Sequence, residues 1–329
     1  MTILVTGATS AVGYFIAKEV ALENKNANIR ILIRSDKPPE HLEKLGFSFV
    51  KGDLTDKLSL EDALEDVEVV YHAAGEAREN VSADLYYTVN QLGTKNILEA
   101  FVKQGGKKFL HVSTVGVFGY QAYKELIKED YPKKGTHPYH ISKWLAEQEV
   151  FRQANEHNFF ASAVRPPYIV GPRDRQMAPK LFDFLINEKK IPLINGGKAL
   201  LSFVHHRDVA QALIACSKEE KANGEAFNVA GSAAPVKEIF ETVGQICNKE
   251  PNFLKIGFRA AYTLGIISEI IAKITKSKPK ITRRRVHQFS ITRTYDTSKL
   301  ETVVGFKPKF GLKEMFEDAY SWMKEENLV

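Results

Sequence analysis

Hydrophobic residues along the first half of the chain follow two alternating patterns. Short β-branched and apolar runs, such as 3–5 and 29–33, alternate with segments of helical period, of which 11–23 is the first. Further strand-like runs are found at 47–50, 67–71, 108–113 and 162–164. Strands that alternate with helices form βαβ units, so this pattern predicts an α/β fold built on a doubly wound parallel sheet.

The pattern changes after residue 165. Irregular segments interrupted by proline and glycine follow, then a strand-like run at 226–229, and then mostly helical period. We therefore expect a sheet domain over 1–165, with return segments at about 203–232. The segments 166–202 and 233–329 are expected to form a smaller, mixed and mostly helical C-terminal lobe.

The positive charge of the chain is concentrated in one segment. The formal net charge is +6, and residues 273–285 alone contain seven lysines or arginines and no acid. Because no aromatic residue interrupts that segment, it lacks the stacking platform of a single-strand nucleic-acid groove. We expect no nucleic-acid partner.

An apolar stripe precedes the cationic segment. Its members recur at helical spacing and are Ile266, Ile267, Ile270, Ile271 and Ile274. Three interpretations remain open: core packing in the lobe, the lining of an apolar substrate pocket, or peripheral contact with a membrane through residues 258–285.

Other features concern the cell compartment. The longest uncharged run near the stripe, 260–268, is far shorter than the roughly 20 residues of a membrane-spanning helix. The chain opens on a strand-like run, so we expect no cleavable apolar leader. Only two cysteines occur, Cys216 and Cys247, which are too few for a disulfide framework. We expect a cytoplasmic protein, with peripheral attachment to a membrane as the alternative.

The turn after the first strand has the residues of a dinucleotide-binding loop. It runs from Gly7 to Gly13 and leads directly into an amphipathic helical segment. Gly7 permits the tight turn, Gly13 permits close packing of helix on strand, and the amides at the helix N-terminus favour a pyrophosphate. Ser10 stands where a middle glycine is expected, and its Cβ would narrow the approach of a phosphate.

The end of the second strand bears on the choice of dinucleotide. Arg34 stands where an acid would bind the ribose of NAD, and an arginine fork suits the 2′-phosphate of NADP. Asp36, two residues later, is an acid that could bind the ribose of NAD, so NAD remains an alternative cofactor. We expect NADP(H) to be preferred, with NAD(H) as the alternative. Asp53 and Leu54 follow the next strand and are expected beside the adenine.

A tyrosine four residues before a lysine is the main candidate for chemistry. Five such pairs occur, but only Tyr139/Lys143 begins a helix after a strand that ends in Ser113-Thr114. A free phenol has a pKa near 10, so lowering it by roughly 3 units requires about 4 kcal/mol of phenolate stabilisation. A lysine ammonium one helical turn away, together with oxidised nicotinamide, supplies energy of that order. Thr114 is expected to hold the substrate oxygen.

These residues resemble the extended short-chain dehydrogenase/reductase family, which includes NAD(P)-dependent epimerases and dehydratases. The matching motifs span nearly the whole chain and are Thr6-Gly7 to Gly13, Gly52-Asp53-Leu54, His72-Ala73-Ala74, Asn90 with Gly93-Thr94 and Asn96, Val112-Ser113-Thr114 to Phe118-Gly119, Tyr139 with Lys143, Arg165-Pro166, Gly171-Pro172-Arg173 and Phe203-Val204-His205. The departures from the family pattern are Ser10 and Phe118.

The resemblance implies a Rossmann domain over the sheet segments, a substrate-binding lobe and an oxidoreductase. It assigns the proton transfer to Tyr139, the cofactor ribose and the lowering of the phenol pKa to Lys143, and the reacting oxygen to Thr114. The cofactor-binding residues it implies are Gly7, Thr9, Ser10, Ala11, Val12, Gly13, Arg34, Asp53, Leu54, Ala73, Ala74, Tyr139, Lys143 and Pro166.

Three positions distinguish branches of that family. Thr114 is followed by Val115-Gly116 instead of the acidic pair of sugar dehydratases. Tyr168 replaces an asparagine, and Leu201 replaces an arginine, that would contact a sugar diphosphate. The chain is therefore more similar to 3β-hydroxysteroid dehydrogenases and dihydroflavonol reductases.

We expect hydride transfer between nicotinamide and a secondary alcohol or ketone of a fairly apolar small molecule. A nucleotide-sugar 4-epimerase and a non-catalytic dinucleotide sensor are the alternatives. His205 and His206 lack a third ligand at metal-binding spacing, so we expect no metal. By analogy with the family, helices covering 90–101 and 142–154 would form a homodimer interface.

Overall fold

A seven-stranded parallel sheet forms the larger part of the molecule. The computed structural model describes residues 1–79, 81–187, 190–277, 279 and 281–329. The strand order is β10-β6-β5-β4-β1-β2-β3, and every neighbouring pair is parallel. The strands are β1 (Thr2–Thr6), β2 (Asn28–Ile33), β3 (Ser48–Lys51), β4 (Val67–His72), β5 (Lys108–Val112), β6 (Phe160–Arg165) and β10 (Glu225–Asn228). The predicted α/β fold with a doubly wound sheet is confirmed.

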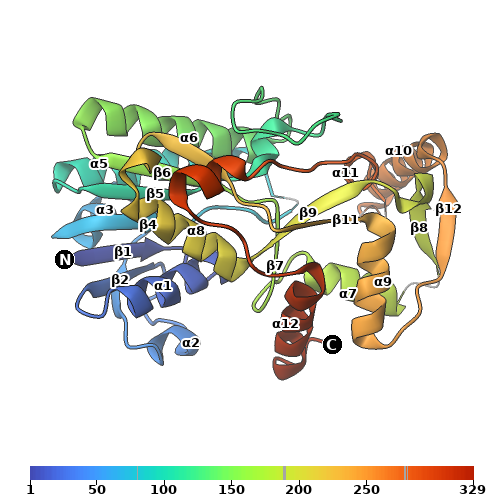
Figure 1. The fold of residues 1–329 in the computed structure, drawn as a ribbon, viewed down its shortest axis with the longest axis horizontal. Helices are drawn as coiled ribbons and strands as arrows, with labels where there is room; N and C mark the ends of the chain where they lie inside the picture. The colour runs from blue at the N-terminus through green and yellow to red at the C-terminus, as the bar shows by residue number, and fades with distance from the viewer. Residues whose placement is uncertain (80, 188–189, 278, 280) are drawn as a thin grey trace.

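Helices cover both faces of this sheet (Figure 1). One face carries α1 (Ala11–Glu23) and α8 (His206–Lys218); the other carries α3 (Lys57–Ala63), α5 (Gly93–Lys103) and α6 (Pro138–His157). Side chains of β1 alternate between two cores, since Ile3 and Val5 pack with α1 and α8 while Leu4 packs with the helices opposite. The short elements are α2 (Glu40–Glu43), α4 (Ala83–Tyr86), η1 (Tyr87–Leu92), η2 (Val115–Phe118) and η4 (Glu220–Ala222).

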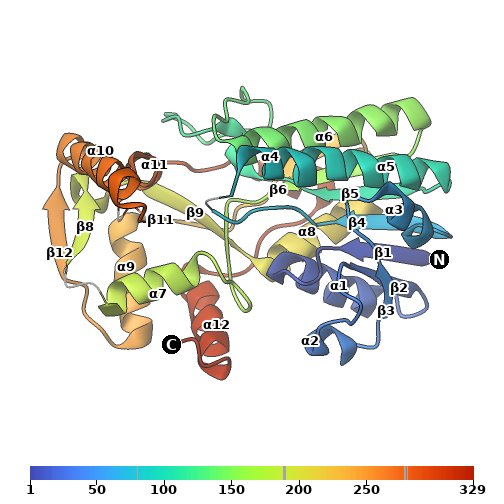
Figure 2. The same ribbon diagram turned by 180° about the vertical axis from the view of Figure 1, so that it is seen from behind.

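A smaller lobe lies at the other end of the molecule (Figure 2). Strands β7 (Tyr168–Val170), β9 (Leu200–His205) and β11 (Ser232–Pro235) form one sheet, and β8 (Ile191–Ile194) pairs with β12 (Phe253–Ile256). The helices of the lobe are α7 (Ala178–Asn187), α9 (Val236–Cys247), α10 (Phe258–Thr275), α11 (Arg283–Gln288) and α12 (Leu312–Glu325), with the short turn η3 (Asn195–Gly197). Its core is built around Phe182, Phe203 and Phe316.

The chain crosses between the two parts more often than the sequence suggested. Helix α8 and strand β10 return to the large sheet, whereas β9 pairs with β7 and β11 in the lobe. Near the C-terminus, η5 (Leu300–Val304) packs back on the large sheet, where Leu300 lies in one core with Phe227 and Val229. The segment 233–329 therefore includes a stretch that belongs to the sheet domain.

A buried ion pair fixes helix α6 to the sheet. Arg165, the last residue of β6, donates to the Glu147 carboxylate through Nε (3.0 Å) and through Nη2. Both side chains are buried, and Arg165 also donates through Nη1 to the carbonyl of Glu129 at 3.0 Å. Because removing either member would leave a buried charge unpaired, the pair sets how α6 lies on the strand ends.

Candidate active site

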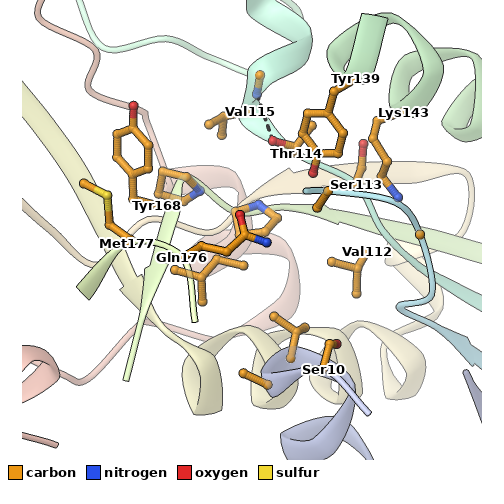
Figure 3. Close-up of a pocket in the computed structure, with 18 of the residues that line it drawn as sticks. Ser10, Val112, Ser113, Thr114, Val115, Tyr139, Lys143, Tyr168, Gln176 and Met177 are labelled. Atoms are coloured by element: carbon orange, nitrogen blue, oxygen red, sulfur yellow. Dashed lines mark hydrogen bonds between the residues drawn. The ribbon is translucent and has the colours of Figure 1, made fainter. Parts of the chain in front are cut away.

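A deep cleft opens at the carboxyl ends of the parallel strands. It is a cavity of about 460 Å³ bounded by the segments that follow β1, β4, β5 and β6, the place where open α/β sheets bind ligands. The predicted site residues that line it are Thr9, Ser10, Ala11, Val12, Ala73, Thr114, Tyr139, Lys143 and Pro166. Figure 3 shows Tyr139, Thr114, Ser113 and Lys143 grouped on one side of this space, with Ser10 across from them.

The glycine loop is closely packed beneath the cavity. Gly7 has φ +76°, and a Cβ built on it would lie 2.6 Å from the amide nitrogen of Ala74. A Cβ on Gly13 would lie 2.2 Å from the carbonyl oxygen of Gly7. Ser10 donates through Oγ to Gly7 O (2.7 Å) and accepts from Gly13 N (3.4 Å), so it caps α1. This loop and the N-terminus of α1 fit a pyrophosphate.

The remaining predicted cofactor residues do not line the cavity: they are Gly7, Gly13, Arg34, Asp53, Leu54 and Ala74. Gly7, Gly13 and Ala74 form the tight contact below it. Arg34 is exposed after β2 and Asp53 follows β3. Burial would raise the pKa of Asp53, but hydrogen bonds from Thr55 and the positive charge of Arg34 lower it.

Tyr139 lies in the first turn of α6, where His137 caps the helix by accepting from Tyr139 N at 3.2 Å. Burial raises the pKa of the Tyr139 phenol to about 12, while a hydrogen bond with the Thr114 hydroxyl acts in the lowering direction. Thr114 Oγ1 also accepts from Gly116 N at 3.1 Å. Threonine and tyrosine are therefore held together, as the sequence predicts.

Lys143 is directed elsewhere than the sequence led us to expect. Its Nζ lies 3.3 Å from Nε2 of His111, and burial lowers the pKa of the ammonium to about 8 against the opposing charge of Glu147. In the ligand-free cleft, burial has the largest effect on the Tyr139 phenol and raises its pKa. The lowering of that pKa by Lys143 stays a prediction for the cofactor-bound protein.

Several residues of the cavity escaped the sequence analysis. Tyr120, His140, Arg293, Glu76 and Gln176 all line it. No spacing rule singles them out, because His140 lies beside Tyr139 in α6 and the others come from loops or from a segment far along the chain.

A second cavity of about 390 Å³ lies beside the first, in the lobe. The two share Tyr168, Gln176 and Met177, which Figure 3 shows together on the side of the cleft away from Tyr139. Most of its lining is apolar and comes from α7, α9, α10, α11 and the β8–β12 pair, with Leu181, Phe184, Ile194, Phe240, Leu264, Val286 and Phe289 as the main contributors.

Acids neutralise part of the cationic segment. Arg283 pairs with Glu269 at 2.7 Å, and Glu79 pairs with Arg284 (2.8 Å) and Arg285 (3.2 Å). Glu79 also pairs with Lys180 at 3.0 Å, and these cations bring its pKa down to about 2 although burial would raise it. The segment is therefore less positive than the sequence implied. Lys278 and Lys280 lie outside the described residues.

The isoleucine stripe does not pack in the core. Ile267, Ile270, Ile271 and Ile274 are 46 to 76% exposed on the outer face of α10, and none of them lines the second cavity. Two of the three interpretations are therefore wrong for these four side chains, namely core packing and pocket lining. Among the described residues, no helix combines the length and apolar character needed to cross a membrane.

The glycine loop, the Tyr139/Lys143 pair and the strand-end threonine thus stand around one cleft, and a family model containing these features covers most of the chain. The model of the NAD dependent epimerase/dehydratase family matches residues 3–230. The chain belongs to this family. Its members are enzymes of the extended short-chain dehydrogenase/reductase type.

Individual members of the family show a range of reactions. The chain is 26% identical to the sterol-4-alpha-carboxylate 3-dehydrogenase (decarboxylating) of Candida albicans, over 99% of this chain and 98% of that one. The crystal structure of gox2253 has a TM-score of 0.83 and 26% identity, covering 100% and 99% of the two chains. A Bacillus cereus UDP-glucuronic acid 4-epimerase in complex with NAD has a TM-score of 0.77 at 24% identity, with 99% of each chain covered, and shares the fold.

The buried ammonium of Lys143 should make the ligand-free protein less stable at neutral pH. Its folded pKa of about 8 lies below the ordinary value of 10.5, so charge burial costs stability below pH 8 and this cost disappears as the pH rises toward 10.5. We expect Lys143→Met to increase the free energy of unfolding by about 1–3 kcal/mol at pH 7 and by much less at pH 10. Urea unfolding at both pH values measures this.

The matched control for this prediction is Lys18→Met, which removes the exposed lysine of another tyrosine–lysine pair on α1. It should change stability little at either pH. An equal effect of Lys143→Met at pH 7 and pH 10 would contradict the assignment of a buried, titrating ammonium.

Proposed function

We propose that the protein is an NAD(P)-dependent dehydrogenase or reductase that interconverts a secondary alcohol and a ketone on a fairly apolar molecule of hydroxysteroid or dihydroflavonol type. The observation that carries this proposal is that a mostly apolar cavity adjoins the cleft of Tyr139 and shares Tyr168, Gln176 and Met177 with it. A molecule whose carbinol reaches Tyr139 and Thr114 would place its body among the apolar side chains beyond Tyr168 and Met177.

The chain's own residues would carry the proton transfer. When bound, the oxidised nicotinamide supplies the hydride acceptor. Thr114 Oγ1 would hold the reacting oxygen and Tyr139 Oη would take its proton. With a pKa of about 12, the phenol of Tyr139 needs added positive charge before it can act as a base near neutrality. Lys143, still largely protonated at pH 7, would supply that charge on leaving His111 for the cofactor ribose.

Preference for NADP(H) is the finer part of this proposal. Arg34 is exposed at the end of β2, and among the described residues it has no ion-pair partner, so its fork is available for a 2′-phosphate. The competing acid, Asp36, is held by Lys51 at 2.6 Å. An Asp36 engaged in this way is less available to the ribose hydroxyls of NAD.

A 4-epimerase is the second candidate, since the B. cereus enzyme shares the fold. Such an enzyme would use the same three residues with no net change in the redox state of its cofactor. Two features of this chain oppose it. Leu201 is fully buried, and the hydroxyl of Tyr168 accepts from Arg293 and Gln288, so neither position is free for a diphosphate.

A turnover and binding experiment tests the proposed function. With NADP⁺ present, a 3β-hydroxysteroid should raise the melting temperature and form NADPH, whereas UDP-glucose should do neither. Tyr139→Phe should lower kcat by at least about 100-fold while NADP⁺ affinity stays nearly unchanged, because it removes only the proton carrier. Tyr320→Phe, in another tyrosine–lysine pair on α12, is the matched control. Undiminished activity of Tyr139→Phe would refute the mechanism.

The cofactor assignment has its own test. Arg34→Asp should raise KM for NADP⁺ by about tenfold to 100-fold, since a charged hydrogen bond to phosphate is lost and a repulsive carboxylate is gained. KM for NAD⁺ should fall. Lys37→Asp, three residues further along the same exposed loop, is the control for charge alone. If the NADP⁺/NAD⁺ ratio of Arg34→Asp equals that of the wild type, Arg34 does not contact the 2′-phosphate.

A further inference from the structure

Arg293 is a buried cation in the wall of the active-site cavity. The residue is only 7% exposed, and its guanidinium lies 4.6 Å from the ring centre of Tyr120 and 5.7 Å from that of Tyr168. Through Nη2 it donates to the Tyr168 hydroxyl (2.9 Å) and to the carbonyl of Gln288 (3.3 Å). Its buried Nε has no hydrogen-bond partner among the described residues.

The charge of this guanidinium is not neutralised within the described part of the chain. The other buried arginine of the strand ends, Arg165, has Glu147 as its counter-ion, whereas Arg293 forms no ion pair with any described carboxylate. An arginine remains charged at every physiological pH, and a buried unpaired charge costs several kcal/mol. Two tyrosine rings offset part of that cost. The remainder would be offset by an anion in the cavity.

We propose that Arg293 binds an anionic group of the substrate, and that the substrate is therefore an apolar hydroxy acid. This inference rests on the proposed function, since it concerns the molecule oxidised at Tyr139. A carboxylate matches the site because one guanidinium neutralises one negative charge. The apolar part of the molecule then extends past Tyr168 into the second cavity.

Three matched ligands test the assignment. A 3β-hydroxysteroid that carries a carboxylate, its methyl ester and the corresponding phosphate monoester are compared with NADP⁺ as oxidant. We expect wild-type kcat/KM to favour the acid over the ester by about tenfold to 100-fold. Arg293→Met should lower kcat/KM for the acid by about tenfold to 100-fold more than it lowers kcat/KM for the ester, and Arg293→Lys should restore part of the preference for the acid.

Three results would overturn the proposal: no preference for the acid, a higher kcat/KM for the phosphate, or an equal loss of activity on acid and ester in Arg293→Met. The last result would mean that Arg293 has only a structural role. Removing an unpaired buried charge should leave the variant at least as stable as the wild type, which a melting curve checks.

Calorimetric titration of acid and ester into the NADP⁺ complex separates this proposal from the proposed function. Acid that binds through Arg293 without being oxidised would refute the dehydrogenase and retain the anion site. Oxidation of the ester with no Arg293-dependent binding of the acid would refute the anion site and retain the dehydrogenase.

A second, independent observation concerns the outer face of α10. Its inner face packs through Ala261 against Ile194 and Val286, which leaves the opposite face without a partner in this chain. The exposed apolar side chains there are Leu264, Ile267, Ile270, Ile271 and Ile274. Figure 1 shows α10 at the end of the lobe farthest from the large sheet, so nothing on the sheet domain covers this face.

We infer that this face rests on an anionic lipid bilayer. Exposed cations flank the apolar stripe, with Arg259 near the start of α10 and Lys273 and Lys276 at its end. Among the described residues none of these three forms an ion pair, unlike the arginines of α11. An apolar helix face bordered by lysine and arginine suits the boundary between lipid headgroups and acyl chains. Leu264 also lines the second cavity, so a lipid-dissolved substrate would enter beside the membrane.

Vesicle sedimentation tests this contact. The full chain should sediment with phosphatidylcholine vesicles that contain phosphatidylglycerol and much less with phosphatidylcholine alone. The double variant Ile267→Glu, Ile271→Glu should remain in solution with unchanged cofactor binding, while Leu22→Glu, which charges an exposed leucine of α1, should sediment like the wild type.

Equal sedimentation of the double variant, or no sedimentation of the wild type, would refute the bilayer contact. A wild-type dimer that the double variant converts to a monomer would instead identify a second copy of the chain as the partner of this face.

Discussion

The buried ion pair between Arg165 and Glu147 is the constraint on which the active site depends. Glu147 lies one helical turn beyond Lys143 and two beyond Tyr139, so the contact that holds α6 to β6 also places the catalytic candidates over the strand ends. Replacing such a pair with apolar residues can preserve stability, but breaking it cannot. In this protein the Arg165–Glu147 pair fixes the rotation of α6 about its axis, and hence which of its side chains face the cleft.

The cleft itself holds ionisable groups in states that oppose their proposed roles. Burial raises the pKa of Tyr139 to about 12 and lowers that of Lys143 to about 8, and the Arg293 guanidinium has no counter-ion within the part of the chain that the structure describes. Each of these costs would be reduced by a bound partner: added positive charge for the phenol, ribose hydroxyls for the ammonium and an anion for the guanidinium. Ligand binding would therefore recover free energy that the ligand-free protein loses by burying these groups. This recovered free energy would contribute to the affinity and specificity of the site.

Sequence periodicity predicts the large sheet well because its βαβ units are local. The first unit, from β1 through α1 to β2, is encoded within about 30 residues, and its glycines Gly7 and Gly13 are required by a contact between themselves. The lobe is less predictable, since irregular segments separate its short strands β7, β9 and β11, and η5 returns to the other domain. No local pattern encodes such pairings.

The same limit applies to the site. Tyr139, Lys143 and Thr114 were identifiable because they lie in recognisable motifs, but Arg293 became visible only when residue 293 was brought beside Tyr120 and Tyr168. The effect of burial on the site was also beyond the sequence, because spacing does not reveal that Lys143 contacts His111 or that burial raises the pKa of the Tyr139 phenol.

Tyr168 connects substrate choice to the fold. The tyrosine hydroxyl accepts from Arg293 and Gln288, and its ring packs on Phe203 in the core of the lobe. Tyr168 therefore anchors a cation where the two cavities meet and lines both of them. Because the ring is part of the lobe core, the anion site and the apolar cavity are coupled through packing, and a change at Tyr168 would alter both together.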